Sequence, residues 1–99
     1  MPDIIISDTS CLILFHNIGE LELLHKVYNT ITTTPEVARE FSEKLPEWIK
    51  IERVKDKKYQ EFLETQVDLG EASAIALAKE MDYPLLLLDD LKARKLAVN

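Results

Sequence analysis

Two stretches of the chain are continuously apolar, and both are short enough to be strands. The run DIIIS covers residues 3–7, and the run PLLLLD covers residues 84–89. Strands of a parallel sheet covered on both faces have such unbroken apolar runs, whereas a half-exposed strand alternates apolar and polar residues. We therefore predict that both stretches are parallel strands buried on two faces.

Two further stretches predict strands of a different character. Residues 29–34 (NTITTT) are rich in β-branched threonine, and residues 48–54 (WIKIERV) alternate apolar and polar positions. β-Branched residues favour strands, and alternation is typical of a strand with one exposed face. We expect residues 48–54 to form an edge strand.

Helical patterns fill the segments between these strands. Gly19 is placed to end the first helix, and Thr34 followed by Pro35 has the order of an N-cap and a first helical residue. The alternation of strands and helices predicts a three-layer α/β/α fold with a mostly parallel sheet. The predicted helices cover residues 9–19, 20–28, 35–44, 57–66, 70–81 and 90–98.

Composition narrows the class of protein. The 99 residues are 46% hydrophobic and 30% charged with only 2 Gly and 4 Pro, which indicates one folded domain. No apolar stretch is long enough to span a membrane, and no basic-then-apolar leader precedes the first strand, so we expect a cytoplasmic protein. The single cysteine, Cys11, excludes a disulfide framework and is expected to be a small buried side chain.

The formal net charge of -6 argues against a surface that binds nucleic acid as a whole. A nucleic-acid substrate would need a local basic patch or bound metal ions to offset this repulsion.

Carboxylates follow the two apolar strands. Asp8 comes directly after IIIS, and Asp89 and Asp90 come after LLLL. Ligand sites of α/β sheets lie beyond the carboxyl ends of the strands, and like charges held close there destabilise each other unless a cation lies between them. Hard oxygen ligands suit Mg²⁺ or Mn²⁺. The alternative role of each aspartate is to cap a helix N-terminus, but one cap does not require two aspartates.

Two glutamates are candidates to complete this cluster. Glu40 lies at the border of the apolar face of its helix and is placed to lean inward. Glu71 opens a helix that is apolar on nearly every side, where the helix dipole stabilises a carboxylate whether or not it binds metal. Glu36 and Glu43 have the pattern of solvent-exposed neighbours.

Four motifs, in this order, resemble those of PIN-domain nucleases, especially small prokaryotic ones of the toxin type. They are ISDTSCLI, PEVAREF, LGEASAIALA and LLLLDDLKARKLA, and they extend along nearly the whole chain. The resemblance implies a three-layer α/β fold, an acidic pocket that holds Mg²⁺ or Mn²⁺, and hydrolysis of RNA phosphodiester bonds.

The resemblance also implies roles for particular residues. Asp8, Glu40 and Asp90 resemble the catalytic carboxylates, with Asp89 as the alternative to Asp90, and Ser10 resembles a small hydroxyl residue that supports them. Glu71 stands where many relatives have an aspartate. The expected metal ligands are Asp8, Glu40, Glu71, Asp89 and Asp90.

Basic residues near these carboxylates would contact the RNA backbone, although an ordinary charged helix face explains them equally well. They are Arg39, Lys92, Arg94 and Lys95. The resemblance further implies a homodimer and, for toxins, a small antitoxin-like partner that inserts a basic side chain into the acidic pocket.

The chain stops at Asn99, whereas the family usually continues with another strand and helix. We expect a single PIN-like domain over residues 1–99 that lacks these elements and has an open sheet edge. Two alternatives remain. One is a PIN-like module that binds or dimerises without cutting, which the acidic balance favours. The other is a phosphatase or phospho-receiver, whose acidic motifs do not match DTSC.

Overall fold

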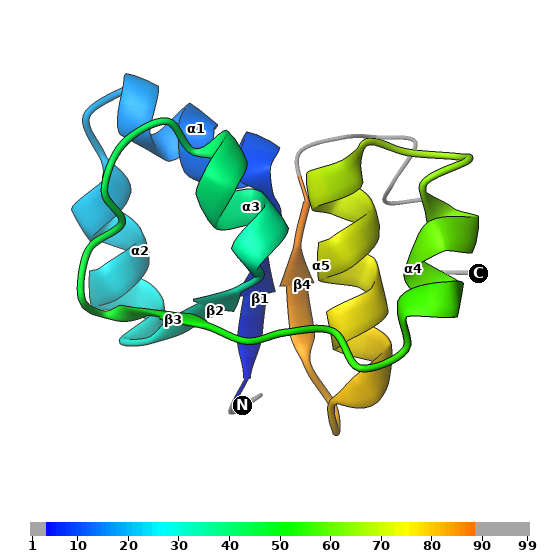
Figure 1. The fold of residues 1–99 in the computed structure, drawn as a ribbon. Helices are drawn as coiled ribbons and strands as arrows, with labels where there is room; N and C mark the ends of the chain where they lie inside the picture. The colour runs from blue at the N-terminus through cyan, green and yellow to red at the C-terminus, as the bar shows by residue number, and fades with distance from the viewer. Residues whose placement is uncertain (1–3, 89–99) are drawn as a thin grey trace.

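The computed structural model describes residues 4–88, and these form a four-stranded sheet with helices around it (Figure 1). The strands are β1 (Ile5–Ser7), β2 (Ile31–Thr33), β3 (Ile49–Ile51) and β4 (Leu85–Leu87). Their order in the sheet is β3-β2-β1-β4, and every pairing is parallel. The α/β fold predicted from the sequence is therefore confirmed.

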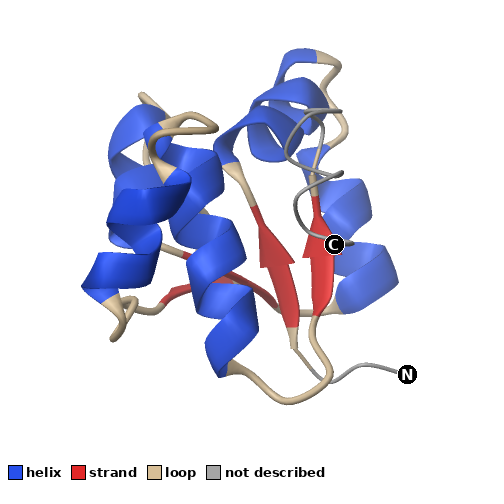
Figure 2. Ribbon diagram, turned by 90° about the vertical axis from the view of Figure 1, so that its right-hand side faces the viewer, coloured by secondary structure: helices blue, strands red, loops and turns tan. Residues whose placement is uncertain are grey.

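Five helices connect the strands in the described part of the chain. They are α1 (Thr9–Asn17), α2 (Leu21–Tyr28), α3 (Pro35–Glu40), α4 (Lys57–Leu63) and α5 (Leu69–Glu80). Figure 2 shows helices on both sides of the strands. The predicted helix over 90–98 lies outside the described residues.

Two hydrophobic cores lie on opposite faces of the sheet. Ile5 packs with residues of α1, α2 and α3, whereas its neighbour Ile6 packs with residues of α4 and α5. Successive side chains of a strand point to opposite faces, so the continuous apolar run of β1 supplies both cores at once. All three residues of β1 are buried, as predicted.

The strand β4 differs from its prediction. The strand exists, lies beside β1 and is parallel to it, but Leu85 is 36% exposed and the next two leucines are half-buried. The prediction of burial on two faces is wrong because, among residues 4–88, β4 pairs with β1 alone and is an edge strand. The predicted edge position of β3 is confirmed within the same residues.

Helix ends also differ from the sequence pattern. Gly19 adopts a φ of +72°, a left-handed conformation that glycine tolerates, and α1 ends two residues before it. The helix α3 ends at Glu40, four residues earlier than predicted, because Phe41 leaves the helical conformation and buries its ring in the core. No helix within residues 4–88 is long and apolar enough to cross a membrane.

Candidate functional site

The carboxyl ends of β1 and β4 coincide, because Ser7 pairs with Leu87. Asp8 follows directly, its backbone N–H donates to the Leu87 carbonyl oxygen (3.2 Å), and its side chain is fully buried. Asp8 Oδ1 also accepts a hydrogen bond from the Cys11 backbone N–H (2.9 Å), so this residue caps the N-terminus of α1. The aspartates expected after β4, Asp89 and Asp90, lie outside the described residues.

The next residue connects Asp8 to α3. Thr9 Oγ1 donates a hydrogen bond to Glu40 Oε1 at 2.6 Å, although the two residues are 31 positions apart in the sequence. Glu40 ends α3, and its side chain is exposed apart from this contact. The hydroxyl therefore fixes the direction of a carboxylate that is otherwise free to move in solvent.

Ser10 makes the corresponding contact with α5. Its Oγ donates to Glu71 Oε1 at 3.2 Å, and Glu71 Oε2 accepts from the backbone N–H of Asp68, also at 3.2 Å. Asp68 and Glu71 form a capping box at the start of α5, and Glu71 is only 3% exposed. Glu71 therefore stabilises the N-terminus of α5, which is the structural role that its position at a helix start allowed.

Three consecutive residues, the DTS of the first motif, therefore connect three segments of the fold. Asp8 begins α1, Thr9 holds the carboxylate that ends α3, and Ser10 holds the carboxylate near the start of α5. The sequence indicated Asp8, Ser10, Glu40 and Glu71, but it did not indicate Thr9.

Gly70 makes room for the contact between Thr9 and Glu40. A Cβ atom built on Gly70 would lie 2.2 Å from Glu40 Oε1 and 2.2 Å from Thr9 Oγ1, far inside van der Waals contact. Glycine is a poor helix former, so its presence in the second position of α5 is a sequence signal of close packing. Sequence analysis missed this signal because nothing in the chain pattern says which atoms approach the helix.

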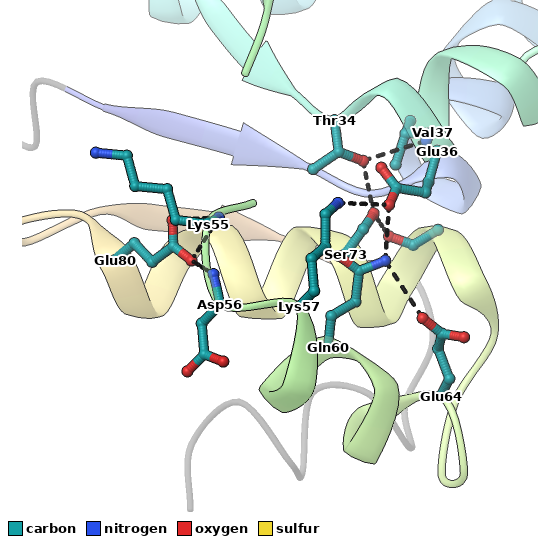
Figure 3. Close-up of polar contacts among 11 residues, drawn as sticks. Thr34, Glu36, Val37, Lys55, Asp56, Lys57, Gln60, Glu64, Ser73 and Glu80 are labelled. Atoms are coloured by element: carbon teal, nitrogen blue, oxygen red, sulfur yellow. Dashed lines mark hydrogen bonds and ion pairs between the residues drawn. The ribbon is translucent and has the colours of Figure 1, made fainter. Parts of the chain in front are cut away.

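A chain of hydroxyl contacts joins α3 and α5 beneath these residues (Figure 3). Thr34 caps α3 by accepting from the Val37 N–H (3.2 Å), and its Oγ1 lies 2.5 Å from Ser73 Oγ. Ser73 Oγ in turn donates to the Gly70 carbonyl oxygen (2.8 Å). All these polar side chains are buried, so the relative position of the two helices is fixed by hydrogen bonds as well as by packing.

The prediction that Glu36 is solvent-exposed is wrong. Glu36 is 6% exposed and accepts hydrogen bonds from Gln60 Nε2 (2.7 Å) and Lys57 Nζ (3.4 Å), as Figure 3 shows. Burial alone would raise its pKa, but the hydrogen bonds from Gln60 and its own backbone N–H and the charge of Lys57 together lower the pKa below 4.5. The helix's own sequence could not show that α4 covers its first turn. Glu43 is exposed, as expected.

The carboxylates of this region supply the hard oxygen donors that Mg²⁺ and Mn²⁺ prefer. Within residues 4–88, however, no three His, Cys, Asp or Glu side chains form a group that could hold a metal ion. A complete ligand set would therefore need the carboxylates after β4. Of the expected RNA contacts, Arg39 is exposed next to Glu40, and Lys92, Arg94 and Lys95 lie outside the described residues.

Residues 4–99 match a family model described as a PIN domain. No curated protein and no solved structure matches the chain.

Proposed function

Because the chain belongs to the PIN-domain family, as its motifs indicated, we propose that it is a divalent-metal-dependent ribonuclease. PIN domains are generally nucleases and typically use divalent metal ions. The observation that carries the proposal is the contact between Thr9 and Glu40, which brings the end of α3 to the residue after Asp8 at the carboxyl end of β1. A carboxylate held in this way is preorganised, whereas an exposed glutamate is ordinarily mobile.

We assign the roles as follows. Asp8, Glu40 and Asp90 are the catalytic carboxylates, and Glu71 and Asp89 are further candidate ligands. A bound Mg²⁺ or Mn²⁺ would lower the pKa of a water molecule and offset the charge that develops on the phosphoryl oxygens. The chain's own part includes the hydroxyl groups of Thr9 and Ser10, which orient Glu40 and Glu71 respectively. The basic side chains assigned to the RNA backbone are Arg39, Lys92, Arg94 and Lys95.

We also propose two protein partners, a second copy of the chain and a small antitoxin-like protein with a basic side chain for the acidic pocket. Large apolar side chains exposed on α1, at its C-cap and on α2 support an association of some kind. They are Ile13, Leu14, Ile18, Leu23 and Val27. A monomer in light scattering at micromolar concentration would rule out the homodimer, and a native pull-down without a small basic partner would argue against the antitoxin.

A second candidate function is a PIN-like module that binds without cutting. One observation favours it: both oxygens of Glu71 already accept hydrogen bonds, one from Ser10 and one from the backbone of Asp68. A carboxylate engaged in this way must give up contacts in order to bind a metal ion.

Cleavage of a mixed-sequence RNA separates the two candidates. The purified protein is assayed with Mn²⁺, with Mg²⁺ and with chelator, beside the variant Asp8→Asn. Asparagine is as good an N-cap as aspartate, so α1 should stay folded while the charge is lost. We expect metal-dependent cleavage that falls by about 100-fold or more in the variant, as when one electrostatic contact to a transition state is removed. The same background in every lane, with either metal, with chelator and in the variant, would support the non-catalytic module.

A further inference from the structure

The net charge of -6 is unevenly distributed along the chain. Residues 50–58 (KIERVKDKK) contain five of the 12 Lys and Arg residues but only two of the 18 Asp and Glu residues. This segment therefore has a local net charge of +3. It covers the last two residues of β3, the connection that follows and the first two residues of α4.

The segment begins at the edge of the sheet where the candidate site lies. β3 is parallel to β2, and Ile51 pairs with Thr33, so the segment leaves the sheet at the strand end where α3 begins. It then runs past the sheet to α4 (Figure 1), where Lys57 Nζ lies 3.4 Å from Glu36 Oε2. Glu36 precedes Glu40 by four residues, about one helical turn or ~6 Å along the axis. Lys57 thus comes within about two turns' length of the proposed catalytic glutamate, whereas the backbone of Lys55 contacts Glu80, ten residues or ~15 Å along α5 from the Gly70 that packs against Glu40.

The first cation of the segment, Lys50, lies on the face of the sheet that α4 and α5 cover. Lys50 pairs with Thr32, and Thr32 pairs with Ile6. Paired residues of neighbouring strands share a face, and Ile6 belongs to the core beneath α4 and α5. Lys50 therefore projects from the face that α4 and α5 cover, and it is exposed at the sheet edge.

Apart from Glu36, which pairs with Lys57, the carboxylates near this segment contact its backbone and not its cationic side chains. Glu80, at the end of α5, accepts hydrogen bonds from the backbone N–H groups of Lys55 (2.9 and 3.0 Å) and Asp56 (2.8 Å). Asp56 Oδ1 accepts from the Tyr59 N–H (3.1 Å) and caps α4. Figure 3 shows the Lys55 side chain extending away from the Glu80 carboxylate. The backbone is held in place while the ammonium group stays in solvent.

Four cations of the segment are consequently exposed and outside any ion pair with the described residues: Lys50, Arg53, Lys55 and Lys58. Because they form no such ion pairs, these cations contribute little to the stability of the fold. They are unpaired within residues 4–88 although the protein has many carboxylates that could have paired with them. Cations presented on a fixed backbone match a polyanion, since neutralising phosphates releases condensed counterions. The carboxylates elsewhere on the chain are screened beyond a Debye length of about 8 Å at physiological salt.

We propose that Lys50, Arg53, Lys55 and Lys58 form a surface that binds the phosphate backbone of single-stranded RNA where the strand extends away from the cleavage site. This inference rests on the proposed ribonuclease function and adds the contact surface that an acidic protein needs. The surface is distinct from Arg39 and from the basic residues after β4. It supplies affinity without base specificity, because its contacts are with phosphates.

The test compares two double variants with the same change in net charge. Lys55→Gln/Lys58→Gln removes two cations of the proposed surface, and Lys26→Gln/Lys44→Gln removes two exposed lysines elsewhere. Binding of a fluorescently labelled 12-nucleotide RNA is measured by anisotropy in chelator, so that no cleavage occurs, between 50 and 200 mM salt. For single strands the slope of log K against log salt changes by about 0.7 for each phosphate contact. We expect the slope to fall by about 1.4 in the first variant, with several-fold weaker binding, and to stay unchanged in the second.

Equal slopes and affinities for the two double variants would overturn the proposed surface, as would undetectable binding by the unmodified protein at 50 mM salt. The cleavage assay with Mn²⁺ keeps this result separate from the proposed function. Cleavage by the unmodified protein together with equal binding of the two variants would refute the surface and leave the nuclease intact. Binding that depends on Lys55 and Lys58 without any metal-dependent cleavage would support the surface and refute the nuclease.

Discussion

At the scale of single residues, the contact between Thr9 and Glu40 depends on three side chains of different sizes. Thr9 is 8% exposed and supplies the hydroxyl, Glu40 supplies the acceptor, and Gly70 supplies the space that a Cβ atom would fill. Removing the hydroxyl leaves Glu40 with no described contact that fixes its direction. Thr9 is therefore a positioning residue in the proposed site, and it acts through Glu40.

Variants of Thr9 test this role. Thr9→Val has nearly the same shape without the hydroxyl, and Thr9→Ser keeps the hydroxyl and loses a methyl group. We expect Val to lower the apparent Mn²⁺ affinity and the cleavage rate by about 10–100-fold, as is typical when a group that orients a metal ligand is removed. Ser should stay within a few-fold of the unmodified protein. Metal titrations of cleavage, together with urea unfolding of each variant, distinguish positioning from stability. Equal losses in Val and Ser would show that the fit of the whole side chain, and not the hydroxyl alone, matters.

At the scale of elements, the sequence predicted the order of strands and helices but not their surroundings. The apolar runs of β1 and β4 look alike, yet one strand is central and fully buried and the other lies at the edge of the described sheet. Hydrophobic pattern reports what a strand is able to bury, whereas burial depends on its neighbours. The burial of Glu36 has the same explanation, since the helix that covers it begins 21 residues later in the sequence.

The prediction at this scale concerns the connection between β3 and α4. Glu80 lies in the last turn of α5, where a negative charge opposes the helix dipole, so its contacts with the backbone of Lys55 and Asp56 must compensate. We expect Glu80→Gln to cost about 1 kcal/mol of stability, because a neutral amide replaces a charged acceptor of two N–H groups. The amides of Lys55 and Asp56 should exchange faster with deuterium.

The control is Glu61→Gln, which removes an exposed carboxylate from α4 for which the described structure shows no hydrogen bond or ion pair. It should leave both the exchange of these two amides and the unfolding curve unchanged. Unaltered protection in Glu80→Gln would mean that packing of Val54, which is 3% exposed, is enough to hold the connection.

At the scale of the whole molecule, the negative net charge does not indicate where RNA could bind. The sequence predicted that an acidic nuclease needs a local basic patch, and it placed that patch at Arg39 and after β4. The segment 50–58 was not recognised because Glu52 and Asp56 interrupt it and make it look like an ordinary charged surface. Only the structure shows that Asp56 and Glu80 are engaged with backbone N–H groups. Local charge therefore depends on which groups the fold has already paired.

The stability of the whole chain should depend on pH through Glu36. Its pKa in the folded protein is below its ordinary value of 4.5, so between these values the unfolded chain binds more protons than the folded one. The stabilisation from Glu36 is thus complete well above pH 4.5 and is lost as the pH falls through the lower, folded-state pKa. Urea unfolding at pH 7 and at pH 3.5 should show a smaller loss of stability in Glu36→Gln than in the unmodified protein.

The comparison of these two proteins cancels the contribution of the other carboxylates, which titrate in both. Gln at this position still accepts from Gln60 Nε2 but no longer attracts Lys57, so the variant should also be less stable at pH 7. Glu22→Gln, an exposed substitution on α2, should keep the pH dependence of the unmodified protein. If Glu36→Gln loses as much stability on acidification as the unmodified protein does, then Glu36 is not held in its charged form by α4.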